Sequence, residues 1–554
     1  MNRDAPSNKL RLLLAFLRSH KRRALCSFLL DLLANACVIA LSLLMAQTIS
    51  VLFGFNSIRG RFIGLASGNI DRLFVLLFSL ILVKLLLDFG RLWLRGTLSE
   101  AFAHQLRSLA FAQHLRADFR YHESRARGKS LLRFSGDLGS AQRLLTHGVL
   151  QYAADLALIL MGILFMAQFD ARLSFLVAGL TVTGWLLNRI INAKMRHAEA
   201  QRRSKKAGLL AHVSDTLQYL PAILVFNRSP RVLQRFAKKS ELVRELGNRY
   251  RSLAAASEAL PIFFVQLLLV SVLLVGWKWD ISGSSLFAIV LVLMTWRTPL
   301  SRILRAGAVW KKGVLSLEKL ELLLRSPMAV EGNGVLKNHR ACTLRLQNVH
   351  LRFGQKTVLK DISFHLSQGE TICLSLRTGG GKTVLTKLIA GLYLPDSGSI
   401  ECNGQPVESF TAQSLRRQIS FVSEAFPLAG KTLLDALSNS SKPTVLARAK
   451  REFQLLQTSF PMLQNLDIQE KNRLTATSLS SGQQRILQCL RAVLTDKPFL
   501  VLDEPFAGLD LETVKVLARL LDKYREGRGV LLLTSRPDLL AEISWDKMNL
   551  QDLG

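Results

Sequence analysis

The sequence predicts a membrane domain made entirely of α-helices, followed by an α/β P-loop nucleotide-binding domain with a helical subdomain. Apolar stretches long enough to span a bilayer occupy the first 304 residues, and after residue 341 the pattern changes to short strands alternating with helices. A glycine-rich stretch in this second part ends in Gly381, Lys382 and Thr383. We expect a membrane domain at 1–325, a linker at 326–340 and a nucleotide-binding domain at 341–554.

The charge distribution supports a membrane protein. The chain carries 73 Lys and Arg against 40 Asp and Glu, a formal net charge of +33, and 49% of its residues are hydrophobic. Residues 341–554 hold 26 Lys and Arg against 21 Asp and Glu, so +28 of the surplus lies among the apolar runs. The positive-inside rule produces this distribution. No basic motif interleaved with aromatic residues indicates nucleic acid as a partner.

Six apolar runs have the length of membrane-spanning helices. They lie at 24–52, 73–94, 149–168, 173–191, 260–277 and 285–304. Residues 8–18 mix apolar and basic side chains, which predicts a short helix on the cytoplasmic membrane surface. A signal peptide is the alternative, but the first apolar run is too long and lacks a small-residue cleavage site near its end.

The loops between these runs predict the orientation. Three short loops, 54–71, 169–172 and 276–283, are nearly neutral and alternate with the long basic segments 95–143 and 189–251. The basic segments should therefore face the cytosol, which places the N-terminus and the nucleotide-binding domain there as well. No organellar targeting segment is evident, so we expect a bacterial inner membrane.

The two long basic segments contain few prolines and regularly spaced apolar residues. This pattern predicts pairs of helices that extend past the membrane, with turns near 118–127 and 215–226, rather than disordered linkers.

Ionisable residues inside the predicted spans are candidates for contact with a transported substrate, because burying a charge in a membrane is costly. Four residues qualify: Asp31, Lys84, Asp88 and Asp155. The alternative for Lys84 and Asp88 is that they pair with each other across one helical turn.

The second part of the chain contains candidate strands at 342–346, 358–366, 370–375, 419–422, 499–503 and 530–534. A glycine-rich turn and then a helix follow the third strand. Backbone N–H groups in such a turn, together with a helix N-terminus, bind phosphate oxygens. Lys382 would reach the β- and γ-phosphates, and the Thr383 hydroxyl would bind Mg²⁺. The candidate ATP-binding residues of this loop are Arg377, Thr378, Gly379, Gly380, Gly381, Lys382 and Thr383.

Two further motifs accompany the loop. LSSGQ at 479–483 precedes, by about twenty residues, an apolar strand that ends in two acids, FLVLDE at 499–504, and AGLD follows at 507–510. With these motifs the chain resembles an ABC transporter half-molecule of the exporter type, in which six membrane helices are fused to one nucleotide-binding domain. In the membrane half, residues 121–145 resemble the family's first coupling-helix region.

The resemblance implies a role for each motif. Phe353 would stack on adenine. The signature motif would contact ATP bound to a partner domain, through Ser480, Ser481, Gly482 and Gln483. Asp503 would bind Mg²⁺ through water, Glu504 would act as the general base toward the attacking water, and Asp510 would belong to the D-loop.

Three positions depart from the family pattern. Leu376 replaces the first glycine of the phosphate loop, where a residue without a side chain lets the backbone leave the strand. Glu424 replaces the Q-loop glutamine, where its carboxylate could still ligate Mg²⁺. Ser535 occupies the position of the switch histidine and is too short to bridge the γ-phosphate and the partner loop. ATP binding is therefore expected, whereas the hydrolysis rate at this site is left open.

The leading hypothesis is ATP-driven export of an unidentified substrate by a dimer that sandwiches two ATP molecules and alternates between inward- and outward-facing states. ATP and Mg²⁺ are the expected cofactors, and a second half-transporter, membrane lipid and the substrate are the expected partners. One alternative is the catalytically weak half of a heterodimer, slightly favoured over a slow homodimer. Another is an ATP-binding membrane regulator that transports nothing.

Overall fold

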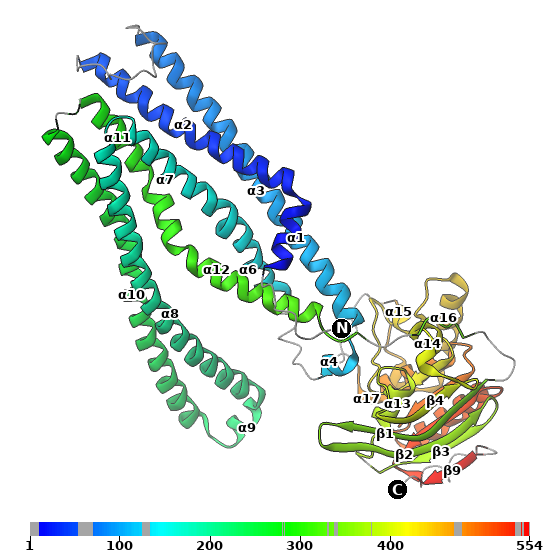
Figure 1. Cartoon of the computed structure of the whole chain (residues 1–554). Coiled ribbons are helices and arrows are strands. Elements are labelled where there is room, and N and C mark those ends of the chain that lie inside the picture. Colours follow the sequence, from blue (N-terminus) through cyan, green and yellow to red (C-terminus); the bar gives the residue numbers. More distant parts are fainter. Residues whose placement is uncertain are drawn as a thin grey trace. The chain divides into compact units, whose positions relative to one another are not determined.

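The computed structural model describes residues 10–53, 70–123, 133–279, 281, 283–328, 332–336, 342–377, 379–469, 479–537, 545 and 548–552. The chain divides into two compact units (Figure 1). One comprises residues 1–114 and 127–325, and the other comprises residues 115–126 and 326–554. The described residues 115–123, which the sequence placed in the membrane domain, therefore belong by their contacts to the nucleotide unit.

The described part of the N-terminal unit is helical throughout. Its elements are α1 (Arg11–Ser19), α2 (Lys21–Phe53), α3 (Ile70–Arg116), η1 (Arg133–Asp137), α6 (Leu138–Arg143), η2 (Leu144–Leu150), α7 (Gln151–Ala167), α8 (Ala171–Gln218), α9 (Leu220–Val225), α10 (Ser229–Lys278), α11 (Gly283–Thr295) and α12 (Arg297–Leu324). Among the described residues, five helices are long and apolar enough to cross a membrane. Residues 285–295 and 297–304 form a pair bent by 41° that would make a sixth. The predicted all-helical membrane domain is confirmed.

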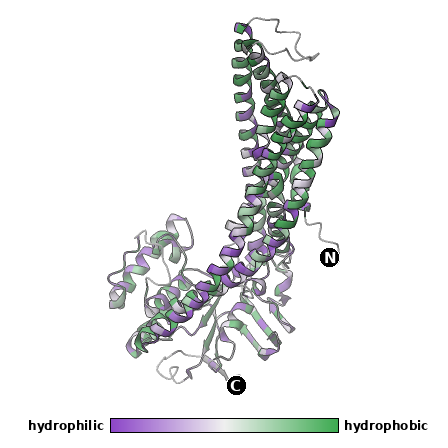
Figure 2. Ribbon diagram, turned by 90° about the vertical axis from the view of Figure 1, so that its left-hand side faces the viewer, coloured by the Kyte–Doolittle hydropathy of each residue, from purple (hydrophilic) through white to green (hydrophobic). Residues whose placement is uncertain are grey.

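The long basic segments form helical extensions, as predicted. Helices α8 and α10 are 48 and 50 residues long, lie side by side and are joined through the short helix α9 within the predicted turn (Figure 1). Figure 2 shows the helices of this unit mainly hydrophobic over part of their length and mixed with hydrophilic residues over the rest. The other predicted turn contains α4 (Phe119–Glu123), while residues 124–132 lie outside the described range.

Close contacts at glycines let the membrane helices pack tightly. A Cβ atom added at Gly162 of α7 would lie 2.5 Å from the fully buried indole of Trp296, which directly precedes α12. A Cβ at Gly184 of α8 would lie 2.9 Å from the ring of Phe264 on α10. Small residues are what membrane helices use to approach each other closely. The aromatic rings therefore fill space that the glycines leave open.

The ionisable residues of the membrane helices pair with one another. Lys84 and Asp88 form an ion pair of 2.6 Å within α3, which is the alternative that the sequence left open. Asp31 of α2, only 1% exposed, lies 2.5 Å from Arg95 and 3.5 Å from Arg91, both on α3. Pairing of this kind offsets the cost of placing charge in a membrane.

The same network continues into two more helices. Arg95 donates a hydrogen bond to Gln151 at the start of α7, and Gln151 donates one to Asp155 at 3.2 Å. The Asp155 carboxylate in turn accepts two hydrogen bonds from the Arg302 guanidinium of α12, at 2.6 and 2.7 Å. A chain of polar contacts thus joins α2, α3, α7 and α12. Direct contact of these acids with a substrate stays a prediction.

The described residues of the nucleotide unit form two sheets. The antiparallel sheet has the order β2–β1–β4–β5 and the parallel sheet the order β6–β7–β8–β3–β9. The strands are β1 (Thr343–Phe353), β2 (Lys356–Ser367), β3 (Thr371–Ser375), β4 (Ser397–Cys402), β5 (Gln405–Pro406), β6 (Ile419–Val422), β7 (Phe499–Asp503), β8 (Gly529–Thr534) and β9 (Met548–Asp552). Besides α4, the described helices of this unit are α13 (Lys382–Ile389), η3 (Val407–Ser409), α14 (Ala412–Arg416), α15 (Leu433–Ser438), α16 (Pro443–Ser459), η4 (Pro461–Leu463), α17 (Ser481–Val493) and α18 (Leu511–Arg525). The predicted α/β class is confirmed.

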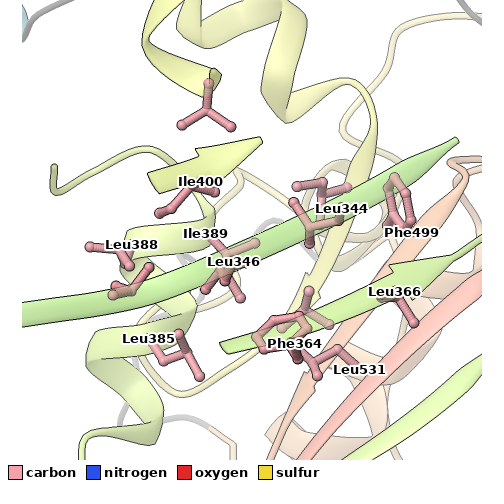
Figure 3. Packing of buried hydrophobic residues seen from close by; sticks show 14 of the residues in the cluster. Leu344, Leu346, Phe364, Leu366, Leu385, Leu388, Ile389, Ile400, Phe499 and Leu531 are labelled. Atoms are coloured by element: carbon pink, nitrogen blue, oxygen red, sulfur yellow. The ribbon is translucent and has the colours of Figure 1, made fainter. Parts of the chain in front are cut away.

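The parallel sheet is buried on both faces, so its strands read as continuous apolar runs. Along β7, Phe499 and Val501 belong to one buried cluster, whereas Leu500 and Leu502 belong to another. The first cluster packs the sheet against α13 and the antiparallel strands (Figure 3). The second packs it against the helices α15 to α18. This two-sided burial fixes the carboxyl ends of β3 and β7, where the functional residues begin.

Candidate nucleotide site

The phosphate loop connects β3 to α13 and has the backbone conformation that its glycines allow. Gly379 and Gly381 have φ angles of 85° and 89°, in the left-handed region that residues with a side chain rarely adopt. A Cβ atom at Gly381 would also lie 2.7 Å from the side chain of Leu359 and 3.0 Å from the Val358 carbonyl. The loop therefore requires glycine at 381. Thr378 lies outside the described residues.

Lys382 is the first residue of α13, and its side chain turns back over the loop. Its ammonium donates hydrogen bonds to the carbonyls of Leu376 at 2.8 Å and Arg377 at 3.1 Å, and lies 3.3 Å from the Glu504 carboxylate. The side chain is largely buried. The lysine is thus placed between the phosphate loop and the end of β7.

Leu376 does not enter the loop. Its side chain is 4% exposed and belongs to the cluster between the two sheets, together with Leu374. Its N–H donates to the Thr534 carbonyl at 3.0 Å, which extends the pairing of β3 with β8 by one residue. The substitution that appeared to weaken the phosphate loop therefore adds a core residue. Arg377, which follows, is exposed, and its contact with phosphate stays a prediction.

Asp503 is the last residue of β7 and accepts hydrogen bonds from two hydroxyl groups. Its Oδ2 atom accepts hydrogen bonds from Thr383 at 3.0 Å and from Ser423 at 2.7 Å. Burial raises the pKa of Asp503, and these two hydrogen bonds oppose the rise without cancelling it. A carboxylate beside hydroxyl oxygens is the kind of donor set that Mg²⁺ prefers. Thr383 and Asp503 therefore suit the metal role that the sequence assigned to them.

Ser423 was not predicted from the sequence, although it directly precedes Glu424, which was. Ser423 is fully buried beside Asp503, whereas the side chain of Glu424 is exposed. The signal that could have found Ser423 is a small hydroxyl residue at the carboxyl end of β6, the strand next to β7. The role of Glu424 as a metal ligand stays a prediction.

Glu504 directly follows Asp503 and has an unusual backbone. Its φ angle is 49°, a left-handed conformation that costs energy for a residue with a side chain. The surrounding contacts hold it there: its N–H donates to the Leu533 carbonyl at 3.0 Å, and its carboxylate accepts from the Ser535 N–H at 2.8 Å. Ser535, at the switch position, therefore contacts the acid through its backbone.

The LSSGQ motif forms the start of α17. Ser480 caps this helix by accepting a hydrogen bond from the Gln483 N–H, and the Gln483 side chain accepts one from the Ser480 N–H at 2.9 Å. Ser481 is exposed, and Gly482 is buried where a Cβ atom would lie 3.2 Å from Leu509. The capping box leaves the first N–H groups of the helix available to an anion. Its action on a partner-bound phosphate stays a prediction.

Comparison with known proteins shows the family. Residues 24–302 match the family described as the ABC transporter transmembrane region, and residues 359–507 match the family described as ABC transporter. The first match covers half of the chain. The chain belongs to the ABC transporter family.

Three relatives of this ABC exporter illustrate the similarity and share one name. An ATP-dependent lipid A-core flippase of Alkalilimnicola ehrlichii is 25% identical over 445 residues, which cover 78% of this chain and 74% of the relative. Flippases of the same name from Ralstonia nicotianae and Cupriavidus metallidurans are each 22% identical, and they cover 94% and 96% of this chain and 88% and 89% of their own length.

These matches establish the general activity. The chain is an ATPase coupled to ATP-driven export, as the sequence predicted, and the regulator alternative is not supported. The nucleotide-domain match includes the phosphate loop, the signature motif and Glu504. Phe353, Asp510 and Ser535 lie outside it, so their roles rest on the resemblance and on geometry.

Asp510 in this ABC exporter caps the helix that follows the D-loop. Its carboxylate accepts hydrogen bonds from the Thr513 hydroxyl at 2.7 Å and the Thr513 N–H at 3.1 Å, and these bonds lower the pKa of Asp510. The residue is exposed. It is thus ionised at neutral pH on the surface of the nucleotide unit.

Phe353, the expected adenine-stacking residue of the exporter, ends β1 with its ring half-buried. The ring packs edge to face on Tyr393 at 5.4 Å, and the Arg120 guanidinium of α4 lies 6.0 Å from its centroid. Arg120 also donates to the Leu394 carbonyl at 2.8 Å. Helix α4, whose residues 121–123 belong to the region that resembles the family's first coupling helix, therefore contacts the residue expected to stack on adenine.

A second contact fixes α4 to the nucleotide unit. The Glu123 carboxylate accepts hydrogen bonds from the Lys387 ammonium at 2.6 Å and from the Tyr393 hydroxyl. Phe119 packs on the Tyr393 ring at 5.7 Å. Lys387 is on α13, the helix that begins at the phosphate loop. We call Glu123, Lys387 and Tyr393 the Glu123 clasp.

Proposed function

We propose that this chain is one half of a dimeric exporter that moves an amphipathic, lipid-like substrate across a bacterial inner membrane, with the nucleotide unit in the cytosol. The names of the relatives support the substrate class. Identity of 22–25% supports a class of cargo and not one compound.

The observation that carries the ATPase half of this proposal is the convergence of Lys382, Asp503 and Glu504 beside one phosphate loop. In the proposed reaction Glu504 accepts a proton from the attacking water, while Lys382 and the N–H groups of the loop stabilise charge on the phosphate. Mg²⁺, with Thr383 and Asp503 as the residues that would hold it, supplies further positive charge at the phosphates.

The signature motif lies on α17 and is expected to serve the partner's phosphate, so each ATP needs two chains. A second copy of this chain or a different half-transporter can supply it. The exposed Glu424 and the switch position Ser535, which holds Glu504 by a backbone N–H alone, favour the weak half of a heterodimer. The buried position of Leu376 supports a role in the core and so weakens one of the three arguments for that choice.

The ATPase rate of the purified chain, alone in detergent, tests both candidates. For a homodimer we expect steady turnover that Glu504→Gln lowers by about 10²–10⁴-fold, with ATP binding retained. Glu512→Gln, an exposed acid in the first turn of α18, is the matched control and should leave the rate unchanged. Turnover that appears only when a second half-transporter is added would support the heterodimer. Strong turnover by the chain alone would reject it.

A further inference from the structure

A cavity of about 400 Å³ lies inside the membrane unit, between α7, α8 and α12. Its walls combine two kinds of side chain. Arg189 and Arg196 of α8 supply positive charge, and Tyr152, Trp185 and Trp310 supply aromatic surface. The cavity belongs to one chain, so a dimer of two such chains would have two. The nucleotide chemistry described above uses none of these residues.

The two arginines have no described acidic partner. Arg189 lies over the ring of Trp185 at 5.3 Å, and the acid closest to Arg196 along the helix, Glu199, pairs with Arg203 instead. Arg189 and Arg196 are both exposed and seven residues apart, which places them on one face of α8 about 10 Å apart along the axis. Two guanidinium groups at this spacing can bind one acidic group between them, because arginine binds phosphate and carboxylate through two parallel hydrogen bonds.

The wall of the cavity is held rigidly. The amide groups of Asn188 and Asn192 on α8 donate to the Leu304 carbonyl of α12 at 3.2 and 3.0 Å. Their side-chain oxygens accept hydrogen bonds from Ser257 of α10. The indole N–H of Trp310 donates to the Gly148 carbonyl at 2.8 Å. The arginines and aromatic rings are therefore presented by a fixed frame, which favours binding.

The position of the cavity along the helices indicates the ligand. Tyr152 lies at the predicted cytosolic start of one span, Arg189 at the predicted cytosolic end of the next, and Trp310 just beyond the end of the last. All three therefore lie at the predicted level of the cytosolic lipid headgroups. Tryptophan and tyrosine are enriched at this level because one side of the ring is apolar and the other polar.

We propose that this cavity binds the phosphomonoester headgroup of an amphipathic lipid as it enters from the cytosolic leaflet. The acidic group contacts Arg189 and Arg196, and the first apolar atoms lie against Trp185 and Trp310. The inference rests on the proposed lipid-like cargo and adds the headgroup class and the residues that select it.

Binding can be measured on the full chain in nanodiscs of neutral phosphatidylcholine, by titration calorimetry with short-chain probes. We expect dihexanoyl phosphatidic acid to bind about tenfold or more tightly than dihexanoyl phosphatidylcholine or inorganic phosphate, because only the first offers both an accessible acid and tails. Arg189→Gln with Arg196→Gln should lower that affinity by about tenfold or more. The control pair Lys205→Gln with Lys206→Gln, exposed on the same helix but not lining the cavity, should leave it unchanged.

A second variant tests the cavity without removing charge. A Cβ atom added at Gly307 meets no heavy atom within 4 Å, so Gly307→Leu should fold normally and project into the cavity. It should reduce phosphatidic acid binding, whereas Gly179→Leu, equally open on α8 outside the cavity, should not.

Equal binding of the two lipids, or unchanged affinity in the arginine pair, would overturn the proposal. Equal binding of inorganic phosphate would assign a free phosphate site instead. The measurement needs no transport, so a failure of lipid flux alone would reject the proposed cargo and leave this site standing.

Discussion

At the scale of single residues, the chain places the residues assigned to ATP hydrolysis at the carboxyl ends of β3 and β7, the two strands that flank β8. Lys382 and Glu504 lie 3.3 Å apart although 122 positions separate them, because β3 and β7 both pair with β8 in one parallel sheet. Leu376 departs from the motif at the glycine position that opens the loop. Its side chain belongs to the buried cluster between the two sheets.

Replacing Leu376 tests that assignment. Leu376→Ala should lower the free energy of unfolding of the nucleotide unit by about 2–5 kcal/mol, because it leaves a cavity in a packed core. It should not increase the ATPase rate. The measurements are the thermal unfolding midpoint of the full chain in detergent and its ATPase rate below that midpoint. A stable variant with faster turnover would show that Leu376 obstructs the phosphate loop.

Much of this site could be predicted from sequence, because phosphate binding and catalysis require contiguous patterns. The loop at Gly379 to Thr383, the acids Asp503 and Glu504, and the signature motif that contains Ser480 were all recognised in this way. Ser423 was missed because its contact with Asp503 joins residues 80 positions apart and no motif marks it. The same is true of Glu123 and Tyr393, which are 270 positions apart.

At the scale of elements, the contact between the short helix α4 and α13 could not be predicted from the sequence. The sequence predicted a turn there, and the structure shows that the turn is held by the Glu123 clasp on α13. The helix that begins with Lys382, the residue assigned to the phosphates, is therefore also the helix that contacts α4 through Lys387. This arrangement predicts that breaking the clasp separates ATP hydrolysis from transport.

Glu123→Gln should keep ATPase activity within about twofold, because none of the hydrolytic groups is touched, and should lower transport about tenfold through loss of a charge-assisted hydrogen bond. Transport is measured as ATP-dependent lipid flux in proteoliposomes. Glu100→Gln, an exposed acid on α3, is the control. Equal losses of ATPase and transport would contradict a coupling role.

The clasp also gives a stability that depends on pH. Burial acts to raise the pKa of Glu123, but hydrogen bonds from Lys387 and Tyr393 outweigh it and hold the pKa below its ordinary value of 4.5. The clasp therefore stabilises the fold above pH 4.5, and this contribution is lost as the pH falls through the lowered pKa. The difference in thermal midpoint between wild type and Glu123→Gln should be constant near neutral pH and shrink below pH 4.5. A difference that grows on acidification would contradict this assignment.

Helix packing in the membrane unit makes a separate prediction. Gly162→Ala would place a methyl group 2.5 Å from Trp296, so it should destabilise the bundle by about 1–3 kcal/mol. Gly179→Ala, where the new methyl group meets no atom within 4 Å, is the matched control and should have no effect. The thermal midpoint in detergent distinguishes them. Equal midpoints would show that α7 does not pack against Trp296 as described.

At the scale of the whole molecule, one unit carries the membrane helices and the other carries the ATPase domain, and the ABC transporter family joins the two in one chain. Apolar run length predicted the membrane helices well, because it follows from the thickness of a bilayer. The orientation that the charge alternation predicts stays a prediction. The bend of 41° before Arg297, the polar network through Asp31 and Asp155, and the cavity beside Arg189 could not be predicted in this way. They depend on how helices rotate about their axes, which sequence periodicity leaves undetermined in segments that are apolar all round.

The most direct test of the account is ATP-dependent movement of a fluorescent phosphate-bearing lipid between leaflets of proteoliposomes that contain this chain, with its partner half-transporter if one is required. We predict flux that needs ATP and Mg²⁺, and that Glu504→Gln abolishes while Glu512→Gln does not. Lipid movement that continues unchanged in Glu504→Gln, or ATP hydrolysis without any lipid movement, would contradict it.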